Sequence, residues 1–182
     1  PSNVQLNREQ AMERIRAKEE AQGWSYTERQ LEGIFATMEN NVTIITGYGG
    51  TGKTSAVTGM LACTDDGYDF KQCALSGKAS ANLTDVTGVE GSTIHSLLRY
   101  DPVMGCFMVN EHNPLDTDLV ILDEGSMVDM ELALALLKAI PNGAKLIILG
   151  DTNQLESIGA GNLLMDLIDS EVVPVVVFDK VH

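Results

Sequence analysis

No stretch of this sequence has about eighteen consecutive apolar residues, the length that a membrane-spanning helix requires. The first residues also lack the short apolar segment of a secretory signal peptide. Cys63, Cys73 and Cys106 are an odd set without C-x-x-C spacing, which disfavours a disulfide framework or a zinc site. We therefore expect a cytoplasmic protein with reduced thiols and no membrane partner.

Basic residues are scarce as well. The chain has 12 lysines and arginines against 26 aspartates and glutamates, for a formal net charge of −14. A protein that binds nucleic acid across a broad face needs an excess of positive charge. The composition therefore argues against a broad nucleic-acid surface, but it is compatible with a narrow contact that binds a strand weakly.

One segment has the pattern of a phosphate-binding loop. The β-branched run Val42–Thr46 predicts a buried strand, and it leads into G-x-x-x-x-G-K-T at residues 47–54. The residues from Ser55 onward can form a helix. The glycines allow backbone N–H groups to surround a polyphosphate at the positive end of that helix. We therefore expect this chain to bind a nucleoside triphosphate.

The motif assigns roles to individual residues. Lys53 would contact the β- and γ-phosphates, and the Thr54 hydroxyl would bind Mg²⁺. The other residues of the cradle would be Gly47, Gly49, Gly50, Thr51, Gly52 and Ser55. An ordinary glycine-rich turn with a surface lysine is the alternative, which the complete motif between a strand and a helix disfavours.

The rest of the chain alternates predicted helices and strands. Two helices are expected first, one over residues 6–22 and one after a capping box of Ser25 and Glu28. Further strands are predicted at 70–75, 119–122, 145–149 and 172–178, with helices between them. This order predicts a parallel α/β sheet covered by helices on both faces. Residues 100–117, with Pro, Gly and Asn around a short apolar segment, predict a small β-hairpin or loop insertion.

Polar residues follow two of these strands at the edge where parallel sheets bind ligands. Asp123 and Glu124 end the strand at 119–122, which is the Walker B pattern: the aspartate would hold Mg²⁺, and the glutamate would orient the attacking water. A solvated acidic strand end is the alternative, which the phosphate loop upstream disfavours. Gln154, just beyond the strand at 145–149, could report the γ-phosphate without adding charge.

Gln30 has two interpretations. Its amide could pair with the N6/N7 edge of adenine, using a donor and an acceptor together. It is also the third residue of a possible capping box that begins at Thr27, in which case its role is structural. The sequence does not decide between them.

Several motifs occur together in one order. They are Ile44–Thr54, Thr93–Leu98, Asn113–Leu115, Asp123–Asp129 and Gly150–Leu155. Together they resemble motifs Q to III of RecD-like superfamily 1 DNA helicases, the group that contains the exodeoxyribonuclease V alpha chain. The resemblance covers about residues 25–182, and the combination is far more specific than the phosphate loop alone.

This resemblance implies a RecA-like P-loop NTPase domain, the first motor domain of an ATP- and Mg²⁺-dependent 5′-to-3′ DNA helicase in repair or recombination. Residues 1–24 would be a helical extension, residues 25–182 the motor domain, and the strand at 145–149 would lie between the phosphate-loop and Walker B strands. It implies Gln30 at adenine and Gln154 at the γ-phosphate. Its partners would be single-stranded DNA at a duplex junction and other subunits of a helicase–nuclease complex.

Contacts to single-stranded DNA are also implied by the resemblance. Residues 76–80 are similar to motif Ia, and the candidate contacts are Lys78, Ser80, Thr93 and His95. Hydroxyl and lysine contacts to phosphates position a strand without reading its sequence. His95 could instead be a helix-start histidine satisfied by the backbone. The insertion at 100–117 resembles the hairpin that such motors place beside the duplex junction.

The sequence departs from the family at a few positions. Gly49 and Gly125 stand where Pro or Ala is more common, and Glu156 replaces a common proline. The last segment, Val175–His182, resembles one that continues into an arginine at the γ-phosphate, and the second motor domain is absent. Since an arginine finger contributes about 10³–10⁵ in rate, we expect these 182 residues to bind ATP–Mg²⁺ but to hydrolyse it weakly.

Other functions are less well supported. A conjugative relaxase or a phage helicase carries similar motifs and is the closest alternative. A nucleotide-gated binding module without motor activity would not need Lys53, Asp123, Glu124 and Gln154 together. A small-molecule kinase on the same core would need a basic lid, which the sequence does not show.

Overall fold

The computed structural model describes residues 6–47, 52–151, 166–167, 169–171 and 173–178. The strands are β1 (Val42–Gly47), β2 (Phe70–Ala74), β3 (Ser92–Thr93), β4 (Tyr100–Asp101), β5 (Cys106–Phe107), β6 (Leu119–Asp123), β7 (Lys145–Asp151) and β8 (Val175–Phe178). The helices are α1 (Arg8–Gln22), α2 (Glu28–Glu39), α3 (Lys53–Ala62), α4 (Gly77–Thr87), α5 (Ile94–Leu97) and α6 (Met130–Ala139), with a 3₁₀ turn η1 (Gly125–Met127).

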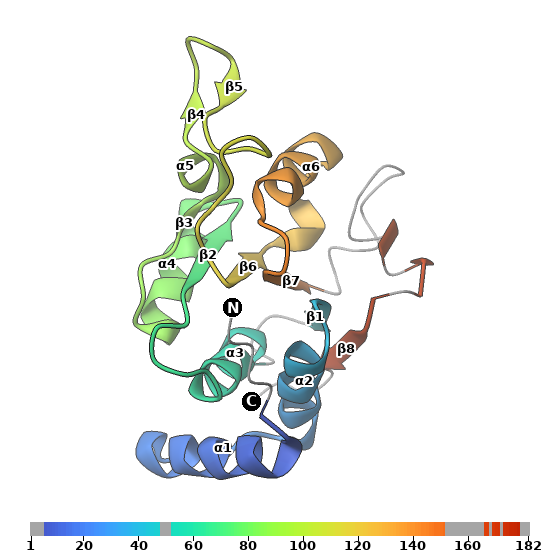
Figure 1. The fold of residues 1–182 in the computed structure, drawn as a ribbon. Coiled ribbons are helices and arrows are strands. Elements are labelled where there is room, and N and C mark those ends of the chain that lie inside the picture. Colours follow the sequence, from blue (N-terminus) through green and yellow to red (C-terminus); the bar gives the residue numbers. More distant parts are fainter. Residues whose placement is uncertain (1–5, 48–51, 152–165, 168, 172, 179–182) are drawn as a thin grey trace.

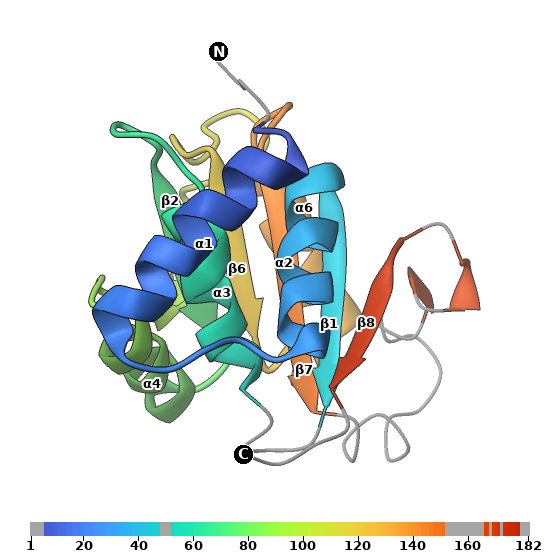
Figure 2. The same ribbon diagram turned by 90° about the horizontal axis from the view of Figure 1, so that it is seen from below.

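A parallel sheet forms the centre of the molecule. Its strand order is β3-β2-β6-β7-β1-β8, and every pairing within it is parallel. The α1, α2 and α3 helices cover one face, and α6 covers the other (Figure 1). Figure 2 shows the same layers from below, with α1 outermost over α2 and α3. The predicted α/β fold is confirmed, including the position of β7 between β1 and β6.

The sheet buries both of its faces because its central strands are apolar at nearly every position. Along β1, Ile45 packs into a cluster with α1–α4, and the adjacent Ile44 packs with α5 and α6 on the opposite face. Ile147 and Ile148 of β7 divide in the same way. Successive side chains of a strand point to opposite faces, so a continuous apolar run fits a sheet that is covered on both sides.

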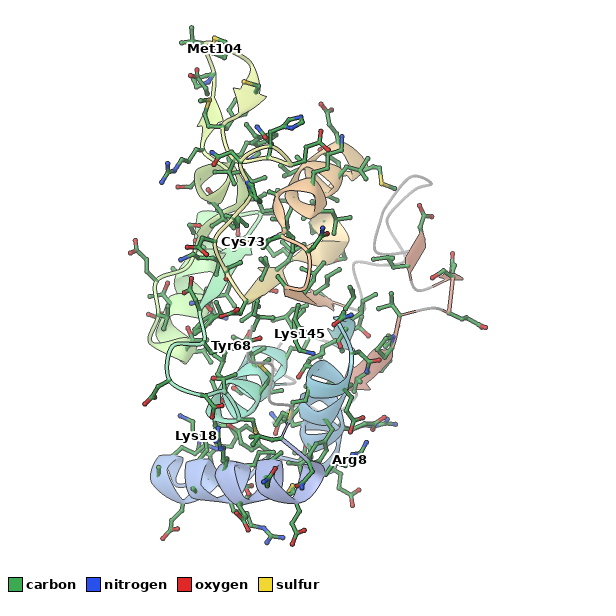
Figure 3. All side chains as sticks on the ribbon, viewed as in Figure 1. Arg8, Lys18, Tyr68, Cys73, Met104 and Lys145 are labelled. Carbon is green, nitrogen blue, oxygen red and sulfur yellow. The ribbon has the colours of Figure 1, made fainter. Side chains whose placement is uncertain are left out.

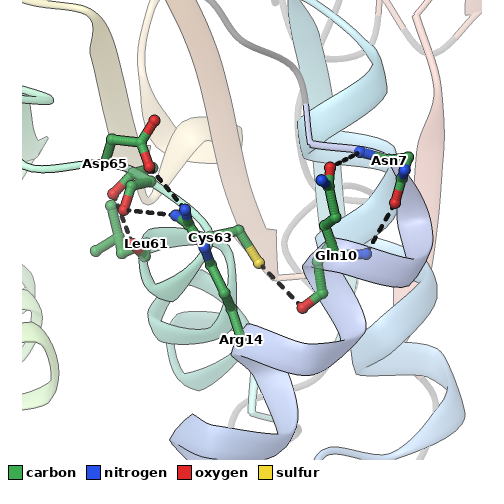
Figure 4. Close-up of polar contacts among 8 residues, drawn as sticks. Asn7, Gln10, Arg14, Leu61, Cys63 and Asp65 are labelled. Carbon is green, nitrogen blue, oxygen red and sulfur yellow. Dashed lines mark hydrogen bonds and ion pairs between the residues drawn. The ribbon is translucent and has the colours of Figure 1, made fainter.

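The α1 helix is anchored to the body of the domain by a few contacts (Figure 4). Its capping box pairs Asn7 with Gln10, as the sequence predicts. Ala11 and Ile15 are fully buried, and Arg14 donates to the Thr64 carbonyl at 3.2 Å and to Asp65 at 2.8 Å. A thin apolar stripe is therefore enough to dock this charged helix, because polar contacts at its side reinforce it.

The start of α2 differs from the sequence expectation. Thr27, and not Ser25, is the N-cap, and its capping box uses Gln30 in place of Glu28. The Thr27 hydroxyl accepts from the Gln30 N–H at 3.2 Å, and the Gln30 side chain accepts from the Thr27 N–H at 2.9 Å. Both pairs have the three-residue spacing of a capping box, so spacing alone could not choose between them.

The predicted insertion contains a two-stranded antiparallel hairpin of β4 and β5. Its turn leaves Val103 and Met104 strongly exposed, at 91% and 72%. Figure 3 shows Met104 at the far end of the molecule from Lys18 of α1. The segment after the hairpin returns to the body of the domain, where Val109 and Leu115 are buried.

The cysteines of the described chain are all unpaired. Burial raises the pKa of the Cys63 thiol to about 11 and that of Cys73 to about 12. Thiols with such pKa values are poor nucleophiles at neutral pH. Within the part of the chain that the structure describes, no helix is both long and apolar enough to cross a membrane.

Gly125 is required by a close approach between η1 and β7. A Cβ atom at this position would overlap the Cγ2 methyl of Ile148 and lie 3.2 Å from the Leu149 carbonyl oxygen. Ile148 is 2% exposed and belongs to the core, so it has little room to move. The departure from alanine at this position is therefore explained by packing.

We predict that Gly125→Ala lowers the free energy of unfolding by about 1–3 kcal/mol, the usual effect of overpacking. Gly77→Ala is the matched control, because a Cβ there meets nothing within 4 Å. Urea unfolding followed by circular dichroism measures both. An unchanged midpoint for Gly125→Ala would show that β7 yields to the added methyl group.

Candidate active site

The phosphate loop joins β1 to α3 at the carboxyl edge of the sheet. Gly47 ends β1, and Gly52 is the N-cap of α3 with a φ of 81°, a left-handed conformation that favours glycine. The Lys53 ammonium donates to the Gly47 carbonyl at 3.0 Å, so it lies against the start of the loop. Thr54 and Ser55 follow in the first turn of α3, half-buried. Gly49, Gly50 and Thr51 lie outside the described residues.

Lys53 is close to two carboxylates from neighbouring strands. Burial lowers the pKa of its ammonium, while the charges of Asp151 at the end of β7 and Asp123 at the end of β6 raise it. Gly47 and Asp151 are partners in the β1–β7 register, which places these strand ends level with each other. The ends of three adjacent strands therefore bring one cation and two acids together.

Asp123 is half-buried. Burial raises the pKa of its carboxyl, against the backbone N–H of Glu124 and the Lys53 ammonium, which lower it. Its Oδ1 atom accepts from the Glu124 N–H at 2.7 Å. Its other oxygen and the Thr54 hydroxyl are ligands of the type that Mg²⁺ prefers, and this ion usually takes few protein ligands beside phosphates and water. Hence these residues fit magnesium, although the described chain has no cluster of three His, Cys, Asp or Glu side chains.

Glu124 adopts a left-handed backbone conformation, with φ 56° and ψ 31°. Positive φ is uncommon for a residue other than glycine and often marks a functional position. Its Oε1 atom accepts two hydrogen bonds from Ser76, from the backbone N–H at 2.8 Å and from the hydroxyl at 2.7 Å. The carboxylate therefore contacts the N-cap residue of α4.

The Gln30 side chain is buried, at 4% exposure, and its amide is already engaged. Its oxygen accepts from the Thr27 N–H, and its nitrogen donates to the Gly52 carbonyl at 3.2 Å. Gln30 therefore takes part in the capping box of α2, as one of its two interpretations predicted, and its side chain also contacts the phosphate loop. Contact with adenine stays a prediction. Gln154 lies outside the described residues, so its contact with a γ-phosphate stays a prediction too.

The four candidate DNA contacts have different environments. Lys78 is exposed on the first turn of α4, whereas Ser80 is buried and its hydroxyl donates to the Gly77 carbonyl at 2.9 Å. Thr93 caps α5 by accepting from the Ser96 N–H at 3.2 Å. His95 is exposed, and its ring contacts those of Tyr100 and Phe107, with centroids 5.6 and 5.8 Å apart. Ser80 is therefore the candidate that the structure presents least to a ligand.

Two residues gain importance only from the structure. Asp151 lies within the Gly150–Leu155 motif, which does not indicate its charge beside Lys53, and the similarity of residues 76–80 to motif Ia does not indicate the contact of Ser76 with Glu124. The strand order would have indicated both, because β2 neighbours β6 and β7 neighbours β1.

A cavity of about 730 Å³ lies at the opposite edge of the sheet, beside Leu115–Asp118 and Pro141–Lys145, and none of the predicted site residues lines it.

Comparisons with known proteins agree with this geometry. A family described as an AAA domain matches residues 30–160. The chain belongs to this family. It is 35% identical to the ATP-dependent RecD2 DNA helicase of Deinococcus radiodurans over 157 residues, and 31% identical to the RecBCD enzyme subunit RecD of Haemophilus influenzae over 166 residues. The resemblance to RecD-like helicases is confirmed.

These alignments cover 86% and 78% of this chain but only 21% and 26% of the two relatives. The chain therefore spans about a quarter or less of their length. Among solved structures, the Pif1 helicase of Candida albicans matches with a TM-score of 0.58 and 18% identity, over 86% of this chain and 40% of that one. The TM-score shows that the two chains share a fold, and the predicted RecA-like fold is therefore confirmed.

The raised pKa of Asp123 leads to a prediction about stability. The ionised carboxylate is penalised by burial, so it opposes folding. This penalty is absent below the unfolded-state pKa of about 3.9 and grows as the pH rises through the higher folded-state pKa. We expect Asp123→Asn to be more stable than the wild type at pH 7 and to lose this advantage near pH 3.

Asp116→Asn is the matched control, because Asp116 is exposed and its removal changes the net charge equally. Thermal unfolding at both pH values gives the comparison. If Asp116→Asn gained as much stability as Asp123→Asn, the effect would come from the overall negative charge and not from burial.

Proposed function

We propose that this chain is the ATP-binding and hydrolysing first motor domain of a RecD-like DNA helicase, acting on single-stranded DNA in the cytoplasm. The observation that carries the proposal is that Lys53, the first residue of α3, interacts with Asp123 and Asp151 at the ends of two adjacent strands. A phosphoryl-transfer site needs a cation for the phosphates and a carboxylate for the metal, and little covalent chemistry besides.

Each residue would have a separate part in hydrolysis. ATP would lie in the loop between Gly47 and Lys53, with Lys53 exchanging its bond to the Gly47 carbonyl for the β- and γ-phosphates. Magnesium, held by Thr54 and Asp123, would neutralise the charge that develops on the phosphates. Glu124 would orient the attacking water. Gln30 at adenine and Gln154 at the γ-phosphate complete the proposed site.

The DNA part of the proposal comes from the relatives. The D. radiodurans relative is named an ATP-dependent DNA helicase, and the structural neighbours include a Bacteroides Pif1 bound to single-stranded DNA. We infer that Lys78, Thr93 and His95 contact the backbone of the translocating strand, with Ser80 supporting the turn. Travel from 5′ to 3′, a duplex junction beside the β4–β5 hairpin and association with other helicase–nuclease subunits follow from the same likeness.

We predict that the 182-residue chain binds a fluorescent ATP analogue in the presence of Mg²⁺ and that Lys53→Ala weakens binding at least tenfold. Glu124→Gln should leave binding within about twofold, because the water-orienting group does not hold the phosphates. Fluorescence titration with and without Mg²⁺ measures both. Equal affinity of Lys53→Ala and wild type would exclude the proposed site.

Turnover gives a second test. The 182-residue chain should hydrolyse ATP slowly, because the arginine expected at the γ-phosphate is not among these residues. Such an arginine finger contributes about 10³–10⁵ in rate. A longer protein that includes a second motor domain should hydrolyse it faster and respond to single-stranded DNA, whereas its Lys53→Ala and Glu124→Gln variants should not. Strand-stimulated turnover by the 182 residues at the rate of the longer protein would contradict this assignment.

A further inference from the structure

The contact between Ser76 and Glu124 has no part in the hydrolytic scheme above. The Glu124 carboxylate accepts two hydrogen bonds, and both donors, the backbone N–H at 2.8 Å and the hydroxyl at 2.7 Å, belong to Ser76. Ser76 is also the N-cap of α4, where its Oγ atom accepts from the Ala79 N–H at 3.2 Å. One serine therefore holds the first turn of α4 and the carboxylate of Glu124 at the same time.

The position of this contact in the sheet shows which way Glu124 is directed. Ala74 and Asp123 are register partners at the ends of β2 and β6, so Ser76 and Glu124 lie just beyond adjacent strand ends. The phosphate loop follows β1, which lies on the other side of β6, beyond β7. Asp123 interacts electrostatically with Lys53 on that side. The two consecutive acids therefore engage opposite sides of β6.

We propose that Ser76 restrains Glu124 and couples strand binding to ATP hydrolysis. In the described arrangement the carboxylate is bound to α4, and engagement of a single strand by the first turn of α4 releases it to orient water at the γ-phosphate. This inference rests on the proposed function. Ser76 is a positioning residue in it, because it acts through Glu124 and touches no substrate.

The first turn of α4 is suited to this coupling. Lys78 is exposed two residues after Ser76, on the same turn, and its ammonium is accessible to a phosphate backbone. Hydrogen bonds weaken steeply as the distance and angle leave their optimum. A small displacement of this turn therefore breaks both bonds together, since both donors belong to Ser76.

The test separates helix capping from the contact with Glu124. Ser76→Asp keeps a good N-cap but places a negative charge against the carboxylate. Ser76→Thr keeps both the cap and a hydroxyl donor. Single-turnover hydrolysis of trace ATP is measured with and without an oligo(dT) strand. An excess of the longer protein that includes a second motor domain is used, because that protein is the one expected to respond to DNA.

Ser76→Asp should raise hydrolysis without DNA on the order of tenfold, the effect of losing a hydrogen bond to a charged group. Its further stimulation by oligo(dT) should be smaller than that of the wild type, and Ser76→Thr should behave as the wild type does. The double variant Ser76→Asp, Glu124→Gln should be as slow as Glu124→Gln alone, because the gain passes through the carboxylate.

A Ser76→Asp protein that is folded, binds the ATP analogue and hydrolyses it no faster than the wild type would overturn the restraint. So would a gain that persists in the double variant. If the wild type itself does not bind the analogue, the proposed function fails first, and the restraint fails with it.

A spectroscopic readout tests the same contact without turnover. The Ser76 amide proton should move upfield in the ¹H–¹⁵N spectrum when the carboxylate is replaced in Glu124→Gln, because a charged acceptor is lost. Adding oligo(dT) to the wild type with the ATP analogue bound should produce a shift in the same direction. A Ser76 amide that does not respond to the strand would contradict the proposed release.

Discussion

Parallel pairing of β1 with β7 and of β7 with β6 is the constraint on which the site depends. The register aligns Gly47 with Asp151 and Leu122 with Ile148, so the three strands end at the same edge of the sheet, with β6 ending two residues before β7. Alternate side chains of these strands pack into two different cores, so a slip by one residue would exchange the side chains between the two faces and disrupt the packing of both. The apolar core therefore positions the charged edge.

Partial burial of the charged groups at this edge of the sheet lowers the free energy of unfolding. Lys53 and Asp123 are both half-buried, and for each of them burial is the main influence on the pKa, in the direction that opposes the charged form. Each acts on the other in the opposite direction, so the pair is stabler than either ion alone. Such opposition is typical of sites prepared for a charged ligand, where a metal ion and phosphates complete the balance.

The fold could be predicted from the sequence because its signals are local and repeated. Apolar runs gave the central strands, and the Asn7 capping box gave the start of α1. The short strand β3 carries no such signal: Ser92 and Thr93 pair with β2 because the chain passes its edge. The start of α2 was misplaced by two residues, since Ser25 and Thr27 offer equal spacing to a glutamate or glutamine.

The site could be predicted only in part. The motifs gave Lys53 and Asp123, which the structure brings together with Asp151. The contact of Glu124 with Ser76 joins residues 48 positions apart, and nothing in either segment indicates it. The burial of Ser80 also escaped prediction, because a serine in a first helical turn can face either way.

If Gln30 contacts adenine as proposed, its side chain would link recognition of the base to the capping box of α2 and to the phosphate loop. Its oxygen already accepts from the Thr27 N–H and its nitrogen donates to the Gly52 carbonyl, so turning this buried amide toward a purine edge would break both bonds. The Thr27 hydroxyl would still cap the helix, and each bond lost costs about 1 kcal/mol, close to what a neutral hydrogen bond to the base returns. Discrimination between ATP and other triphosphates would then be shallow at this position, and most of the affinity would come from the phosphates.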